Sequence, residues 1–290
     1  MKRFILVIIA ELCFFFFTSV PANATIIILV STYDGFIIAA DSRLTLSDKE
    51  RDRIASDSYQ KIFRIGHSSG LAFAGTALLV DLNNQKRSIG SIVEAFKIHE
   101  KISDSTKISP ELITNRLKIF FEQIYNAHRE NIFEGTLAII VFGYDEQNIR
   151  RIYELDFPKE EKSSTGSPTI VGVITPLFTS GTPGCYVLGQ QDVWHRIIKG
   201  YDPSLDDINF SKEKRDSLRY DIRYELMSIQ DGIDFSVFIV RATIEAQRFN
   251  QKSVMGVGGA IDVATITTHG FEWIQKKKLN VEGKESDYRE

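Results

Sequence analysis

Two short, unbroken apolar runs near the start of the chain constrain its fold more than any other feature. The runs cover Thr25 to Ser31 and Phe36 to Ala40, and the turn residues Tyr33, Asp34 and Gly35 separate them. A strand with one face in water alternates apolar and polar residues, whereas a continuous apolar run indicates a strand that is covered on both faces. The pattern therefore predicts a β-hairpin that is buried inside a layered protein.

The rest of the chain alternates between strand and helix patterns. After a polar stretch at 42–58, which we interpret as a loop, strand patterns occupy 61–65 and 70–74. Two helices follow, the second with Ser109 as N-cap and Pro110 at its first position. The later patterns are strands at 136–143, 150–157, 169–174 and 186–188, a surface loop at 159–168, helices at 193–198, 211–227 and 235–249, and a last hairpin at 261–267 and 271–274. This order predicts an α+β fold, a four-layer αββα sandwich of two stacked sheets with helices on both outer faces.

The first 24 residues have the pattern of a secretory signal peptide. Lys2 and Arg3 precede an apolar run, and the run is followed by Ala22, Asn23 and Ala24, the small-x-small pattern of a signal peptidase site. We expect a signal peptide at 1–24, a single domain at 25–275, a charged tail at 276–290, and a periplasmic or secreted location. Retention of the segment as a membrane anchor is the alternative, but the uncharged run at 12–20 is shorter than the roughly 20 residues that span a bilayer.

Composition excludes several function classes. The net charge of −3 argues against a nucleic-acid partner. Of the two cysteines, Cys13 lies in the signal segment, so the mature chain would keep only Cys185 and no internal disulfide. The five histidines are scattered singly and do not have the spacing of a zinc site. We therefore expect no metal and no cofactor.

Cleavage after Ala24 would make Thr25 the first residue of the mature chain. A free α-amine with a pKa of about 8 can take the proton of the neighbouring hydroxyl, which an internal amide cannot do. Asp41 ends the second strand and could hold Lys61, whose ammonium would ease formation of an alkoxide. Gly75 ends the fourth strand, where a backbone N–H could stabilise an oxyanion. Taken singly, each of these residues also has an ordinary structural interpretation: a surface ion pair of Asp41 with Arg43, a solvated strand end at Lys61 and a turn at Gly75.

The four segments that carry these residues resemble, in order, the opening of the proteasome β-subunit family of N-terminal-nucleophile hydrolases. The matching stretches are 25–30, 34–43, 61–65 and 71–75, and 138–145 and 258–267 resemble later segments of that family. The resemblance implies that Thr25 is the nucleophile and its α-amine the base, acting through a water. It further implies that Asp41 and Lys61 form a polarising pair, and that the Gly75 N–H is the oxyanion donor.

The resemblance also has departures. The family places a Ser-Gly pair after a later strand. In this chain the pair can be aligned with Ser180 and Gly181, or with the stretch Gly189 to Gln191, which lacks the serine. Val254 to Val257 offer no side chain that could hydrogen-bond the amine. We take Arg43, Ser180 and Gly181 as candidate substrate-binding residues. The predicted function is an exported threonine hydrolase of peptide or other amide bonds, free of the membrane after cleavage and able to form homo-oligomers. The alternative is a catalytically inactive binding or assembly protein of the same fold.

Overall fold

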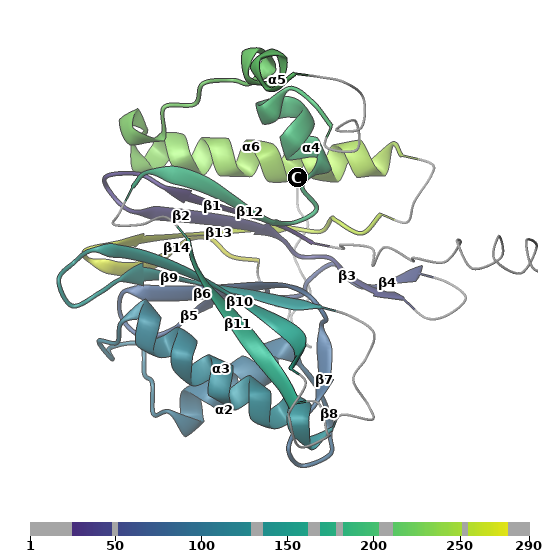
Figure 1. Ribbon diagram of the computed structural model, residues 1–290, viewed down its shortest axis with the longest axis vertical. Coiled ribbons are helices and arrows are strands. Elements are labelled where there is room, and N and C mark those ends of the chain that lie inside the picture. The colour runs from purple at the N-terminus through teal and green to yellow at the C-terminus, as the bar shows by residue number, and fades with distance from the viewer. Residues whose placement is uncertain are drawn as a thin grey trace, which may run out of the picture.

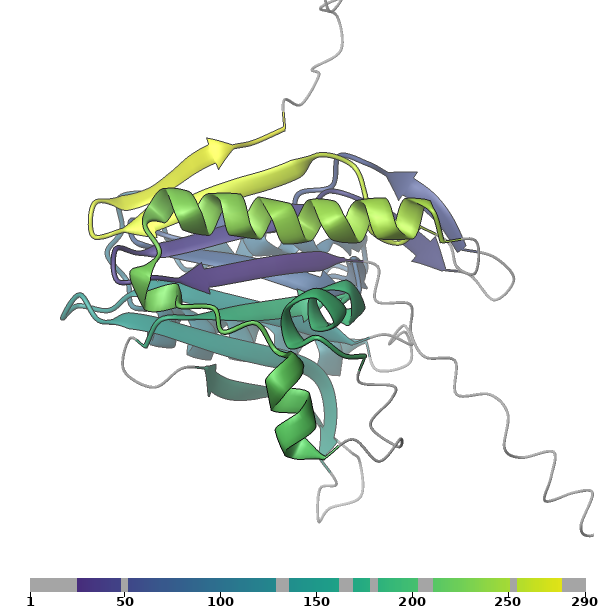
Figure 2. The same ribbon diagram turned by 90° about the horizontal axis from the view of Figure 1, so that it is seen from above.

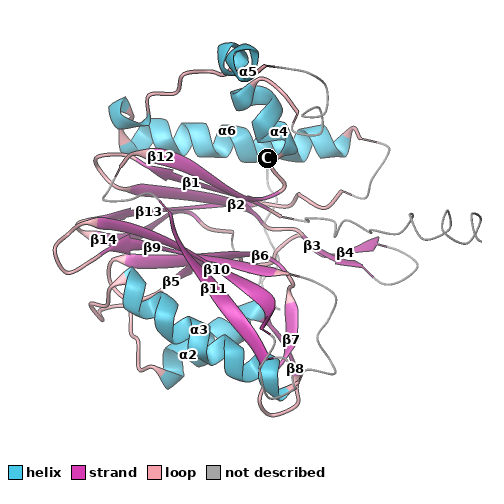
Figure 3. Ribbon diagram, in the orientation of Figure 1, coloured by secondary structure: helices cyan, strands magenta, loops and turns pink. Residues whose placement is uncertain are grey.

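A computed structural model describes residues 25–47, 52–128, 136–161, 169–177, 182–202, 211–250 and 255–277. Within these residues the chain forms two five-stranded sheets that stack face to face, with helices on both outer sides (Figure 1). Figure 3 shows the four layers as helix, strand, strand and helix. The predicted α+β four-layer αββα sandwich is therefore confirmed.

The first sheet contains the predicted buried hairpin at its centre. Its strand order is β12-β1-β2-β13-β14, and each neighbouring pair is antiparallel. Every residue of β1 (Ile26–Ser31) and β2 (Phe36–Asp41) is buried, as the unbroken apolar runs predict. The flanking strands are β12 (Gly184–Gly189), β13 (Ile261–Thr267) and β14 (Gly270–Gln275).

The second sheet has the order β11-β10-β9-β6-β5 and is also antiparallel. Its strands are β5 (Ile62–Arg64), β6 (Ser69–Gly75), β9 (Leu137–Tyr144), β10 (Arg150–Glu161) and β11 (Thr169–Leu177). A separate small hairpin, β7 (Leu78–Val80) with β8 (Lys86–Ser88), follows β6.

Helices cover the outer face of each sheet. The outer face of the second sheet packs against α2 (Ile89–His99) and α3 (Pro110–Ala127). Ser109 accepts a hydrogen bond from the Leu112 N–H, so the predicted N-cap is confirmed. The outer face of the first sheet is covered by α6 (Ile229–Arg248), whose axis is roughly parallel to the strands in Figure 2. The same layer contains α4 (Asp192–Trp194), the π-helical turn η3 (His195–Lys199), α5 (Lys212–Leu218) and the short 3₁₀ turn η5 (Tyr224–Leu226).

Three apolar clusters separate the four layers. The middle cluster joins the inner faces of the sheets, with Phe36 and Phe142 in edge-to-face contact at 5.8 Å between ring centroids. A second cluster lies under α2 and α3, and a third lies under α6. Because β1 and β2 contribute to both the middle and the α6 clusters, their apolar side chains are needed on both faces.

Three segments differ from the sequence-based expectation. The stretch 42–58, expected to be a loop, contains the hairpin β3 (Leu44–Ser47) and β4 (Asp52–Ser56), whose β4 residues 53–55 are exposed. β3 is only four residues long and β4 is mostly polar, so neither strand gives a pattern long enough to be recognised. The start of the loop expected at 159–168 instead extends β10 to Glu161. The single helix expected at 211–227 breaks after Leu218, and the rest is irregular apart from η5.

Candidate active site

Thr25 lies at the buried start of β1, where the chain enters the first sheet. Its side chain and backbone together are 6 % exposed. The Thr25 carbonyl oxygen accepts a hydrogen bond from the Gln190 N–H at 2.6 Å, immediately after β12 ends. Gly189 has a φ of +87°, and a Cβ there would lie 2.0 Å from the same carbonyl oxygen. The glycine therefore allows β12 to close tightly against Thr25.

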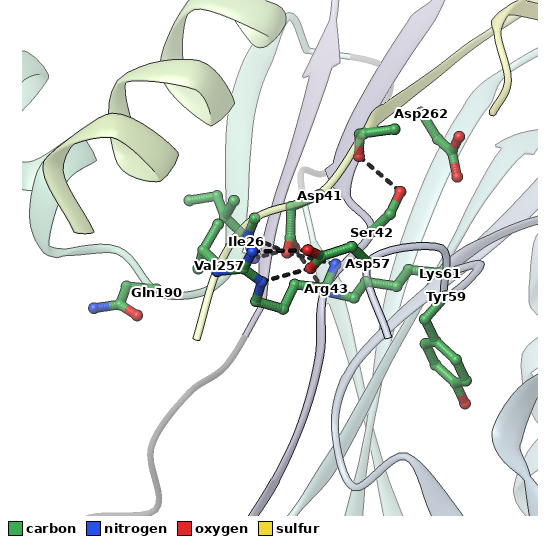
Figure 4. A network of polar contacts seen from close by, with 12 residues as sticks. Ile26, Asp41, Ser42, Arg43, Asp57, Tyr59, Lys61, Gln190, Val257 and Asp262 are labelled. Atoms are coloured by element: carbon green, nitrogen blue, oxygen red, sulfur yellow. Dashed lines mark hydrogen bonds and ion pairs between the residues drawn. The ribbon is translucent and has the colours of Figure 1, made fainter. Parts of the chain in front are cut away.

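Asp41 is the centre of a buried polar network (Figure 4) that includes Ile26, the residue after Thr25. One carboxylate oxygen, Oδ1, accepts the Lys61 ammonium at 2.6 Å and the Ile26 N–H at 3.0 Å. The other, Oδ2, accepts the backbone N–H groups of Arg43 at 3.1 Å and Gly258 at 3.0 Å. All four lone-pair directions of the carboxylate are thus used. The predicted Asp41 and Lys61 pair is formed, and it lies against the peptide unit that follows Thr25.

Lys61 is held in the interior by this pair. Its side chain is 3 % exposed and that of Asp41 is fully buried. Burial lowers the pKa of Lys61 from its usual value, while the Asp41 carboxylate acts in the opposite direction. Arg43 and Lys277 add a further lowering effect because they are nearby positive charges. A lysine with a lowered pKa releases its proton more readily, which suits a group that relays protons.

Gly75 ends β6, one residue beyond the part of the strand that is buried. Its φ is +96°, and a Cβ there would lie 2.0 Å from the Thr136 carbonyl oxygen. Thr136 also accepts the Thr76 N–H at 2.8 Å, so β9 fixes the backbone on the far side of the glycine. A side chain at this position would be strained, so the glycine allows the end of β6 to lie close against Thr136, the residue before β9.

Arg43 does not form the surface ion pair with Asp41 that we considered. Its guanidinium makes a two-pronged pair with Asp57, with Nε 2.6 Å from Oδ1 and Nη2 2.9 Å from Oδ2. This pair raises the pKa of Arg43 and lowers that of Asp57. The Arg43 guanidinium lies over Gly258, where a Cβ would meet Cζ at 2.5 Å. Arg43 therefore fixes the base of the β3–β4 hairpin to the segment that binds Asp41.

A pair of glutamines completes the network, and sequence reasoning missed one of them. Gln247, at the end of α6 and 5 % exposed, donates through its amide to Gln190 and accepts the Val257 N–H at 2.8 Å. A chain of hydrogen bonds thus runs from Thr25 through Gln190 and Gln247 to the loop that binds Asp41. One signal could have identified Gln247. It is a polar residue on the apolar face of α6, three positions after Ile244, which is partly buried and packs against the cluster under α6.

Sequence reasoning also missed a second buried ion pair behind the network. Lys277, at the start of the segment expected to be a charged tail, donates through Nζ to Asp262, and its backbone N–H lies 3.0 Å from the other oxygen of that carboxylate. Lys277 Nζ also contacts Ser42 Oγ at 2.9 Å and the Tyr59 carbonyl at 3.1 Å. Lys277 therefore ties the end of the described chain to the residues on either side of Asp41.

The remaining expectations concern residues outside the described ranges, a metal site and a membrane-spanning segment. Ser180 and Gly181 lie outside the described residues, as does the whole segment 1–24. In the described ranges, no cluster of three or more histidine, cysteine, aspartate or glutamate side chains could hold a metal ion. None of the helices placed by the structure is long and apolar enough to cross a bilayer.

Comparison with known proteins agrees with the fold. Residues 22–158 match the proteasome subunit family. Among solved structures, Anbu (ancestral beta-subunit) from Yersinia bercovieri is similar over 86 % of this chain and 87 % of that chain, with a TM-score of 0.50 and 13 % identity. A Gly-1 mutant of Anbu from Hyphomicrobium sp. strain MC1 is similar over 87 % of this chain and 86 % of that chain, with a TM-score of 0.49 and 13 % identity. Comparison with curated proteins gave no match.

Proposed function

We propose that this chain, whose residues 22–158 match the proteasome subunit family, is a threonine-type N-terminal-nucleophile hydrolase of peptide or other amide bonds. In this proposal, removal of residues 1–24 during export exposes Thr25, and the protein acts in the periplasm or outside the cell. One observation supports the proposal above the others. A single oxygen of Asp41 binds both the Lys61 ammonium and the N–H that follows Thr25.

The proposed reaction begins at the Thr25 hydroxyl. The α-amine of Thr25 takes the hydroxyl proton, and the oxygen adds to the substrate carbonyl carbon. The positive charge on Lys61 lowers the energy of the developing alkoxide, because both groups are shielded from water and their attraction is strong there. The protonated amine then gives its proton to the leaving nitrogen as the C–N bond breaks, which leaves an ester on Thr25. Water, activated by the same amine, hydrolyses this ester.

The oxyanion of each tetrahedral intermediate needs a donor. We assign this role to the backbone N–H of Gly75, which is the exposed last residue of β6. A donor of this kind is worth roughly 3 kcal/mol in the transition state. The fixed partners of Gly75 on β9 favour the role, because a preorganised donor needs no rearrangement during the reaction.

The proposal is tested by the mass of the exported protein and by a threonine-directed electrophile. We expect a mature chain that begins at Thr25 and a single covalent adduct on that residue. Thr25→Ala should give no adduct, and Thr25→Ser should retain part of the reactivity. Thr32→Ala is the matched control, since Thr32 is a fully buried threonine beyond the far end of β1. A mature chain that begins at any other residue rules out the mechanism.

A catalytically inactive binding or assembly protein is the second candidate. The observation that favours it is the absence of a hydroxyl or carboxyl side chain at Met255, Gly256 and Val257, next to the loop that binds Asp41. The only side-chain partner of the Val257 N–H among the described residues is the neutral amide of Gln247. A correctly processed chain that gives no adduct would favour this candidate, because its amine would be free but unreactive.

A further inference from the structure

A cavity of about 220 Å³ lies beside the start of β12 in the first sheet. Figure 1 shows α4 and α5 on the outer, helical side of this sheet. None of the residues that line it belongs to the Asp41 network. Its walls come from the start of β12, from α4 with η3, and from the chain between α5 and η5. The Tyr220 N–H donates to the Ile198 carbonyl at 3.0 Å, which holds the last segment against η3. Gly200, with a φ of +75°, allows this approach, because a Cβ there would lie 2.2 Å from the Leu218 carbonyl oxygen.

The charge at the cavity is positive. Lys199 and Arg219 both line it, and no aspartate or glutamate does. Among the described residues neither cation forms an ion pair. Two cations that share a concave site without a carboxylate attract an anion, and burial of that anion beside low-dielectric walls strengthens the attraction.

One of the lining residues carries a buried hydrogen-bond donor that lacks an acceptor. Trp194 lines the cavity, and its Nε1 is buried with no hydrogen-bond partner in the described part of the chain. Lys199 Nζ lies 5.1 Å from the centre of the Trp194 ring, so the indole and the ammonium are close together. A buried donor without a partner is costly, and an acceptor brought by a ligand would remove that cost.

The other lining side chains favour an apolar body on the ligand. Ile222, Tyr220 and Tyr224 provide aliphatic and aromatic surface. Cys185 also lines the cavity, and burial raises the pKa of its thiol to about 12. The thiol is therefore neutral near pH 7 and unreactive, so a ligand would be held without a covalent bond.

We propose that this cavity binds a carboxylate that carries an aromatic or branched apolar group. The carboxylate lies between Lys199 and Arg219 and accepts the Trp194 indole N–H, and the apolar group packs on Tyr220, Ile222 and Tyr224. Two sources have this chemistry: a free aryl acid, and the C-terminal residue of a peptide that ends in an apolar side chain. The site does not depend on Thr25, so it can exist whether or not the chain is a hydrolase.

The indole N–H signals of the ¹⁵N-labelled protein test the proposal directly. The chain has two tryptophans, and Trp273→Phe assigns their two signals. Titration with hydrocinnamate should shift the Trp194 N–H signal downfield and leave that of Trp273 in place, whereas hydrocinnamamide, its neutral counterpart, should shift neither. A tetrapeptide acid that ends in phenylalanine, compared with its C-terminal amide, distinguishes the peptide source. A saturable shift with either acid supports the site, and the acid that binds more tightly identifies the source.

Variants of the two cations locate the bound carboxylate. Arg219→Met and Lys199→Met should each weaken binding roughly ten- to hundredfold, the range expected for loss of a hydrogen bond to a charged group. Lys276→Met is the matched control, because Lys276 lies 4.8 Å from the ring centre of the other tryptophan, and its binding should be unchanged. The proposal is overturned if neither acid shifts the Trp194 signal at millimolar concentration, if the neutral amides shift it equally, or if both cation variants bind as the parent protein does.

Discussion

The buried pair of Asp41 and Lys61 gives a prediction that does not need a substrate. In Asp41→Asn, one carboxylate oxygen becomes an NH₂ group, and either orientation places that donor against two other donors, because Oδ1 and Oδ2 each accept two hydrogen bonds. The variant also leaves the Lys61 ammonium, 3 % exposed, without a counter-charge. Breaking a buried pair on one side costs about 3–5 kcal/mol of unfolding free energy, and we expect Asp41→Asn to lie in this range.

The double variant separates the ion pair from general damage to the core. Asp41→Asn with Lys61→Met removes both charges, so its loss should be smaller than the sum of the two single losses by about 1–3 kcal/mol. Urea denaturation followed by circular dichroism measures all four proteins. Asp57→Asn is the control, since Asp57 pairs with Arg43 but is 48 % exposed, and its loss should be about 0–1 kcal/mol.

The pH dependence gives a second measure of the same pair. Without Asp41, the pKa of Lys61 in the folded protein falls further, whereas the unfolded chain keeps that proton up to about pH 10. The unfolded state then binds more protons, so the stability deficit of Asp41→Asn should shrink as pH rises from 7 toward 10. Single losses that add to the double loss within about 0.5 kcal/mol, together with a deficit that does not change with pH, would refute the argument.

Three further outcomes follow from the structure. Gly75→Ala should lose about 3 kcal/mol or more of stability in urea denaturation, because φ is +96° and the new Cβ would lie 2.0 Å from the Thr136 carbonyl oxygen; an unchanged midpoint would contradict this. Burial raises the pKa of half-exposed Asp156 to about 6, so its contribution to stability is full below about pH 4 and is lost as pH rises through 6. Asp156→Asn should therefore gain stability relative to the parent as pH rises from 4 to 8, by about 1 kcal/mol after allowance for solvent screening, and a difference that is constant with pH would disprove the linkage. Lys277→Met should cost about 3–5 kcal/mol because it leaves Asp262 buried without its cation, and calorimetric melting that matches the parent would show that the pair does not form.

The sequence was sufficient for the order of the layers because the apolar periodicity there is strong. The unbroken runs at 26–31 and 36–40 predicted a hairpin that is covered on both faces, and both strands are buried throughout. The β3–β4 hairpin was missed because β3 is only four residues long and β4 is mostly polar and exposed, so their side chains give too short a pattern to reveal the pairing. The helix predicted at 211–227 is too long, because the spacing of apolar residues alone does not show where a helix is interrupted.

The site was predictable to a similar degree. Asp41 and Lys61 meet because each lies at the end of a strand next to the start of β1, and strand ends can be placed from sequence. Gln247 and Lys277 could not be placed, because the packing of a helix end and of the end of the last strand decides their contacts. The pairing of Arg43 with Asp57 could not be predicted, because Asp57 follows the second strand of a hairpin that the pattern did not reveal.

The central place of β1 in its sheet bears on when the proposed cleavage before Thr25 takes place relative to folding. β1 is hydrogen-bonded to β12 on one side and to β2 on the other, and Thr25 just before it is buried. Proteases cut flexible, exposed segments, so β1 is a poor substrate once it is paired. If a separate enzyme cuts immediately before Thr25, as we propose, the residues that follow the cut are more accessible to it before β1 joins the sheet. In that case the sheet would form after the new N-terminus at Thr25 had been produced.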